Sequence, residues 1–201
     1  MMERLAELPN DMVLFTQITM EAAEDPEFLR AMKKAHIRGA LMGIESVTPE
    51  GLRSVYKNFN STGESLAARL RTFRENGVHV LGSFIFGLPT DGPDTFAATL
   101  ALAKQADLTF AQFVMMTPFP GTVDFEHWEK SLGESAERIQ GVPVTRYWLL
   151  PGHIRPKLYM PHPKMSSEEI RKRTQTVWDD FYTFSEIWRR SFTLHAPHRD
   201  C

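Results

Sequence analysis

The chain has 201 residues, of which 42% are hydrophobic and 24% are charged, a balance typical of a globular protein with one sizeable core. The formal net charge of −2 gives no electrostatic reason to expect nucleic acid or an anionic membrane surface as a partner. No apolar run approaches the roughly 20 residues of a membrane-spanning helix, and charges interrupt the first residues, so we expect a cytoplasmic protein.

Four apolar runs with strand character occur in the first 122 residues: Met12–Ile18, Ala40–Ser46, Val78–Gly87 and Thr109–Thr122. Their starts are separated by about 30–40 residues, and each gap holds a helical pattern. This is the rhythm of consecutive βαβ units, which predicts an α/β fold with a parallel sheet. Four units are too few for an eight-stranded barrel, so a partial (βα) barrel or an open sheet remains.

Two of the predicted helices have clear starting signals. Asp25 followed by Pro26 begins the first one, and Thr48 followed by Pro49 begins a short one directly after the second strand. Because an N-cap supplies an acceptor for unpaired backbone N–H groups, we expect both side chains to bond to the first turn of their helices.

The pattern changes beyond Gly121. Residues 123–141 look helical, residues 142–165 are rich in proline and aromatic residues, and residues 166–191 are predicted to form one long amphipathic helix capped by Ser166 or Ser167. We therefore divide the chain into a partial barrel at 1–122 and a helical C-terminal extension at 123–201, ending in a mobile tail.

The only cysteine, Cys201, is the last residue of the sequence. One thiol cannot supply an intrachain disulfide, a zinc knuckle or a cysteine-ligated cluster. His195 and His198 precede it at intervals of three, but Pro197 argues against a regular helix there. We expect no metal site from this chain alone.

Ligand-binding groups of parallel α/β proteins gather at the carboxyl ends of the strands. Glu45, at one such end, could bind ribose hydroxyls or an amine, or could cap the following helix. Gly87 and Pro89 form a turn that permits close approach of a ligand, although such turns also simply end strands. Phe119, between two prolines, could stack on a planar base or cover the core.

Taken in order, the stretches "FLRAMKKAHIRGALMGIES", "GSFIFGLPTD" and "MTPFPGT" resemble the second half of the catalytic domain of radical S-adenosylmethionine (SAM) enzymes. The similarity is to the cobalamin-binding group of that superfamily and covers about residues 12–190. It implies a six-stranded partial (βα) barrel, of which this chain has the third to sixth strands. It also implies SAM, a 4Fe-4S cluster that cleaves SAM reductively, and possibly cobalamin as cofactors.

The resemblance implies a SAM site whose residues lie on the predicted strands or directly after them: Glu45, Ser46, Ser83, Ile85, Gly87, Asp91, Met116 and Pro118. Glu45 and Ser46 would contact the ribose or methionyl part. Ser83, Ile85 and Gly87 would lie on the strand that packs the adenine, and residues 116–118 would lie near its edge. Asp91 stands near the place of the family's Glu after the Gly-Leu-Pro turn, with a shorter reach.

This sequence lacks the three-cysteine motif, the first two strands, the Gly-Gly-Glu segment and the cobalamin domain of that family. We therefore expect a missing N-terminal half-barrel, or a dimer partner, to cover the open sheet edge. The leading hypothesis is the C-terminal portion of a radical SAM protein that modifies, possibly methylates, an unknown small or lipid-like substrate. The alternatives are a non-catalytic binding or scaffold module, and an unrelated enzyme using Glu45 and Asp91 as an acid/base pair.

Overall fold

The computed structural model describes residues 1–9, 11–54 and 63–193. The predicted tail and the histidines and cysteine within it lie outside these ranges. The main elements are α1 (Met2–Ala6), β1 (Leu14–Gln17), η1 (Met20–Glu24), α2 (Pro26–Lys34), β2 (Ile37–Glu45), α3 (Pro49–Ser54), α4 (Gly63–Glu75), β3 (His79–Phe86), α5 (Pro93–Gln105), β4 (Phe110–Met115), α6 (Val123–Leu132), α7 (Ser167–Phe181) and α8 (Phe184–Thr193).

The core of the fold is a four-stranded parallel sheet in the order β1-β2-β3-β4. Sequential strands lie side by side, as expected for right-handed βαβ units. The predicted α/β class with four parallel strands is confirmed. No helix in the described ranges is both long and apolar enough to cross a bilayer.

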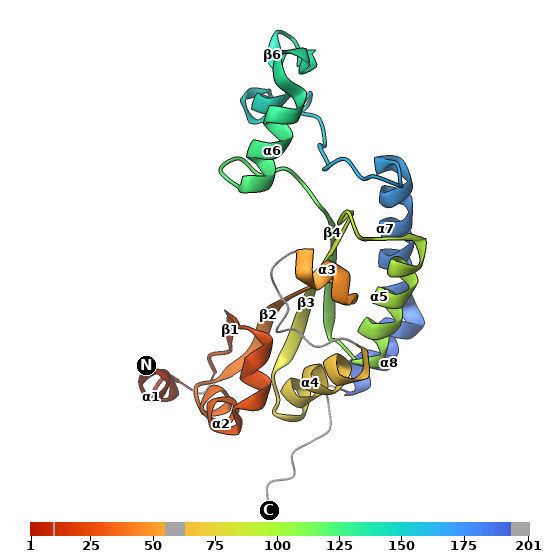
Figure 1. Ribbon diagram of the computed structural model, residues 1–201. Coiled ribbons are helices and arrows are strands. Elements are labelled where there is room, and N and C mark those ends of the chain that lie inside the picture. The colour runs from red at the N-terminus through yellow and green to blue at the C-terminus, as the bar shows by residue number, and fades with distance from the viewer. Residues whose placement is uncertain (10, 55–62, 194–201) are drawn as a thin grey trace, which may run out of the picture.

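Helices cover one face of this sheet, and among the described residues the side chains on its other face are more exposed. Figure 1 shows α2, α4, α5 and α7 arranged around one side of the strands. Side chains on that side, such as Met42, Phe84 and Phe113, are buried, whereas Ser83 and Gln112 on the opposite side are only half-buried. We call the second side the open face. The alternation follows from the two-residue side-chain period of a strand.

Both predicted helix starts are confirmed. Asp25 caps α2 by accepting a hydrogen bond from the Phe28 N–H at 2.9 Å, and Thr48 caps α3 by accepting one from the Gly51 N–H at 3.0 Å. The second strand differs from the prediction at its start, because β2 already begins at Ile37, where it pairs with Leu14 of β1.

Beyond β4 the chain builds a small lobe that projects away from the sheet (Figure 1). The lobe has its own apolar cluster around Phe125, Trp128 and Val144. The prediction of helix through residue 141 is wrong, because α6 ends at Leu132 and is followed by a hairpin of β5 (Arg138–Ile139) and β6 (Val142–Pro143). Gln140 and Gly141 both have positive φ, as a tight hairpin turn requires.

The chain leaves the sheet near residue 122, our boundary between the two regions, and returns to it with α7. Ile170, Val177 and Phe181 of this helix are buried in the main core. Ser166 caps α7 through the Glu169 N–H, as predicted. The single long helix is wrong: the chain turns at Tyr182, and Thr183 accepts a hydrogen bond from the Glu186 N–H at the start of α8.

Candidate functional site

The carboxyl end of β2 carries an unusual backbone conformation at Glu45. This residue has a φ of 67°, and the pairing of β2 with β3 shifts register between Gly43 and Glu45. The left-handed region costs a non-glycine residue about 1–2 kcal/mol, and such conformations cluster at functional sites. The Glu45 side chain is half-buried.

The side chain of Ser46, the next residue, bonds to the backbone at the start of α3. Its side chain is buried, and its Oγ accepts a hydrogen bond from the Thr48 N–H at 3.2 Å. A Cβ atom at Gly51 would lie 2.1 Å from this Oγ, so the glycine makes room for the serine. The structure thus gives Ser46 a local role in joining β2 to α3.

Ser83 and Ile85 lie on the open face of β3, both half-buried. Strand register places Ser83 between Gly43 of β2 and Gln112 of β4, while Ile85 pairs with Val114. Three adjacent strands therefore contribute to one row of side chains. This row lies just before the strand ends, where the fold favours ligand binding.

Asp91 closes the Gly-Leu-Pro turn that follows β3. Its carboxylate Oδ2 accepts hydrogen bonds from the Gly87 N–H at 2.8 Å and the Leu88 N–H at 3.0 Å. Gly87 has a φ of 91°, a backbone conformation that residues other than glycine disfavour. The Asp91 side chain is 1% exposed, and this burial raises its pKa while the two N–H groups oppose the shift.

Residues 157–165, which we call the strap, cross the ends of β3 and β4. The Met160 N–H donates to the Met116 carbonyl at 2.9 Å. The ring of His162 lies 3.0 Å from the Leu88 carbonyl through Nε2, and its Nδ1 accepts the N–H groups of Lys164 and Met165. A neutral ring with its proton on Nε2 satisfies all three contacts. The strap thereby fixes the turn that Asp91 closes.

The predicted residues Met116 and Pro118 follow β4, and Met116 contacts the strap through Met160. The Met116 N–H continues the sheet by donating to the Phe86 carbonyl at 2.8 Å, and Met116 is half-buried. Pro118 is buried. Both residues belong to the segment that links the end of β4 to the small lobe.

Aromatic side chains of α7 bond to the outer edge of β4. The Tyr182 hydroxyl accepts the Ala111 N–H at 3.0 Å and donates to the Ala111 carbonyl at 2.8 Å. The Trp178 indole N–H donates to the Phe113 carbonyl at 2.8 Å. These groups do what a fifth strand would otherwise do, and they blunt an edge prone to aberrant pairing.

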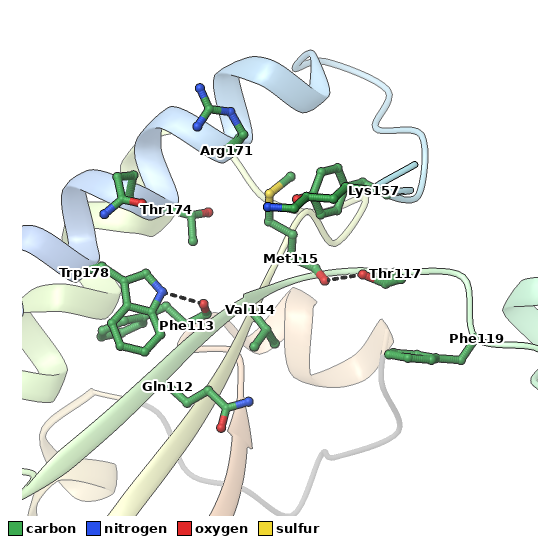
Figure 2. A pocket seen from close by; sticks show the side chains of 12 residues that line it. Gln112, Phe113, Val114, Met115, Thr117, Phe119, Lys157, Arg171, Thr174 and Trp178 are labelled. Atoms are coloured by element: carbon green, nitrogen blue, oxygen red, sulfur yellow. Dashed lines mark hydrogen bonds between the residues drawn. The ribbon is translucent and has the colours of Figure 1, made fainter. Parts of the chain in front are cut away.

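A cavity of about 540 Å³ opens between β4, α7 and the strap. Figure 2 shows Lys157 reaching from the strap into the space beside Met115, with Trp178 and Gln112 on the opposite side. Sequence reasoning missed this cavity, because its walls come from segments about 40–60 residues apart. In the described ranges, no group of three or more His, Cys, Asp or Glu is placed to hold a metal ion.

No family model matches the chain. An uncharacterized methyltransferase of Pyrococcus horikoshii is 31% identical over 166 residues, which covers 83% of this chain and 33% of the relative. The bacteriochlorophyllide d C-12(1)-methyltransferase of Chlorobaculum tepidum is 25% identical over 173 residues, or 86% of this chain and 35% of the relative. The hopanoid C-2 methylase of Rhodopseudomonas palustris is 28% identical over 109 residues, or 54% of this chain and 20% of the relative.

A solved structure has a fold similar to that of this chain. The structure of the radical SAM methyltransferase TsrM from Kitasatospora setae, with cobalamin and a [4Fe-4S] cluster bound, matches 96% of this chain and 47% of that chain, with a TM-score of 0.63 and 18% identity. The chain is thus related in sequence to proteins named as methyltransferases, and its fold matches that of a radical SAM methyltransferase. It spans about a third of the length of the first curated relatives it matches.

Proposed function

We propose that this chain supplies the C-terminal half of a radical SAM domain that methylates an organic substrate. The observation that carries the proposal is the open face itself, on which polar and small residues of three parallel strands share one row near the strand ends. The relatives, all named as methyltransferases or methylases, support the reaction class.

The side chains of this row have the chemistry that SAM requires. The Glu45 carboxylate suits the ribose hydroxyls, as acidic residues after strands do in other nucleotide sites. Ser83 and Ile85 offer one hydroxyl and one apolar side chain for the planar base, and Gly87 allows close approach of the ligand to the backbone. Beside a reduced cluster, SAM supplies the methyl and radical chemistry of the reaction. The chain's own residues bind and orient it.

Ser46 and Asp91 support the site from behind. Their polar atoms bond to backbone groups of the α3 start and the Gly-Leu-Pro turn, respectively. We therefore assign them to positioning Glu45 and Gly87. The sequence holds one cysteine, so the thiolates of a [4Fe-4S] cluster have to come from another segment or chain.

We propose that this partner segment adds to the edge of β1. Trp178 and Tyr182 bond to the edge of β4, whereas β1 pairs with β2 alone among the described residues. The β1 strand also exposes apolar surface, with Val13 72% and Phe15 60% exposed. An N-terminal half-barrel with parallel strands would cover both the backbone edge and these side chains.

The change Glu45→Gln is expected to weaken SAM binding about tenfold, because a hydrogen bond to a charged group contributes roughly 1.5–3 kcal/mol. Calorimetric titration of SAM measures the effect, with the full chain alone and after adding the N-terminal segment of the Pyrococcus horikoshii relative. Glu75→Gln, on the exposed end of α4, is the matched control and should leave affinity unchanged. Absence of SAM binding under both conditions would contradict the proposed function.

The change Gln17→Pro is expected to prevent association with that N-terminal segment. In β1 the N–H groups of Leu14 and Ile18 bond to β2, so by alternation the Gln17 N–H points to the outer edge. Proline removes that donor and blocks an added strand while leaving the bonds to β2. We expect at least a tenfold loss of affinity in a pull-down titration. Gln17→Ala should bind normally, and equal binding of the proline variant would exclude β1 as the docking edge.

A further inference from the structure

The cavity beside β4 contains three polar side chains that make no hydrogen bond or ion pair with described parts of the protein: Lys157, Gln112 and Tyr159. The other polar side chains of its wall are engaged. Arg171 binds Glu168 through two contacts of 2.8 Å, and the Gln175 amide donates to Asp179. Lys157 is exposed, and Gln112 and Tyr159 are half-buried, so these three side chains are available to a ligand in the cavity.

Charge adds to this pattern. Because Glu168 neutralises Arg171, the ammonium of Lys157 is the remaining positive charge among the described residues of the wall. Figure 2 shows its side chain extending into the cavity, away from its own backbone. A single ammonium matches a carboxylate better than a phosphate dianion, which needs more positive charge.

The rest of the wall is apolar. Val114, Met115 and the ring of Phe119, which is 62% exposed, face the cavity. The Trp178 indole has its N–H occupied by the Phe113 carbonyl and therefore offers the cavity its ring surface. Such a wall suits a flat or ring-shaped apolar body.

The position of the cavity relates it to the proposed SAM site. Gln112 pairs with Ser83, and Val114 pairs with Ile85, across the β3–β4 register. The cavity thus begins one strand away from the residues assigned to SAM. A molecule bound in it would lie next to the cofactor.

We propose that this cavity binds the methyl-accepting substrate and that the substrate is an amphipathic molecule with an apolar ring system and one carboxylate. Lys157 pairs with the carboxylate, and Phe119 and Trp178 contact the ring body. The identification of this ligand as the substrate rests on the proposed function, whereas its binding in the cavity is tested separately.

The test uses the full chain and the fluorescent carboxylate pyrenebutyrate, with the neutral pyrenebutanol as its counterpart. Lys157→Met should weaken pyrenebutyrate binding about fivefold, because it removes one charge-assisted contact at a partly exposed site. Lys157→Arg should restore affinity to within about twofold, since the charge is kept. Pyrenebutanol should bind both the wild type and Lys157→Met equally.

Lys130→Met, on the exposed side of α6, is the matched control and should bind pyrenebutyrate like the wild type. The inference is overturned if the wild type does not bind pyrenebutyrate, if Lys130→Met weakens it as much as Lys157→Met, or if pyrenebutanol loses affinity in parallel. SAM titration of the same samples separates the two proposals: intact SAM binding without a Lys157 effect overturns the cavity inference alone. A Lys157 effect without SAM binding contradicts only the proposed function.

Discussion

Phe113→Ala is expected to lower the free energy of unfolding by about 3–5 kcal/mol, the usual cost of emptying a buried phenylalanine site. Phe113 is 2% exposed and lies at the centre of the aromatic core. Its ring stacks with Phe84 at 5.5 Å and meets Trp178 and Phe181 edge-to-face at 5.6 and 5.7 Å. Because these neighbours come from β3 and α7, the cavity left behind loosens the contact between the sheet and its last helix.

Urea denaturation followed by circular dichroism measures this loss. Phe110→Ala, in the same strand, is the matched control, because Phe110 is 52% exposed on the open face. We expect the control to change stability by less than about 1 kcal/mol. Similar losses in the two variants would mean that α7 does not pack against β4 as described.

Asp91→Ala is expected to lower the free energy of unfolding by about 2–4 kcal/mol. The Asp91 carboxylate is the acceptor for two N–H groups, those of Gly87 and Leu88, in a buried turn. Leaving each of these donors without an acceptor costs about 1–3 kcal/mol. Thermal unfolding of the variant, and its SAM titration, would report on the turn and on the site it supports.

Asp91→Asn separates the hydrogen bonds from the charge, since the amide oxygen accepts from the same N–H groups. Burial raises the pKa of Asp91 above its ordinary value of 3.8, so the folded protein binds this proton more tightly than the unfolded chain does. The stabilisation from that proton is complete below about pH 4 and is lost as the pH rises through the raised pKa. The free energy of unfolding of Asp91→Asn, relative to that of the wild type, should therefore increase as the pH rises from acid to neutral. A constant difference would show that the carboxylate keeps an ordinary pKa.

Local signals in the sequence predicted the sheet and its helix starts, because the causes are local. Asp25 and Thr48 bond within three residues of themselves, and a strand's burial pattern is visible in every second residue. The break between α7 and α8 was missed for a physical reason. The Tyr182 hydroxyl is engaged by Ala111, 71 residues earlier, and helical periodicity carries no information about that contact.

The residues of the candidate site also fall into those that the sequence predicted and those whose role depends on contacts between distant segments. The end of a predicted strand led to Glu45, and the family resemblance led to Ser83 and Ile85, but neither could distinguish an exposed polar group from one that closes a turn. Ser46 and Asp91 are of the second kind, and only the backbone geometry reveals it. His162 and Lys157 were missed altogether, since the strap is brought to the strand ends by contacts such as Met160 with Met116.

The bonds from α7 to β4 form late during synthesis of the chain on the ribosome. Trp178 follows its acceptor Phe113 by 65 residues, so β4 is made well before the aromatic groups that bond to it. During that interval the outer backbone edge of the nascent β4 is bare, a condition that invites pairing with other chains. Synthesis of α7 ends that period for β4.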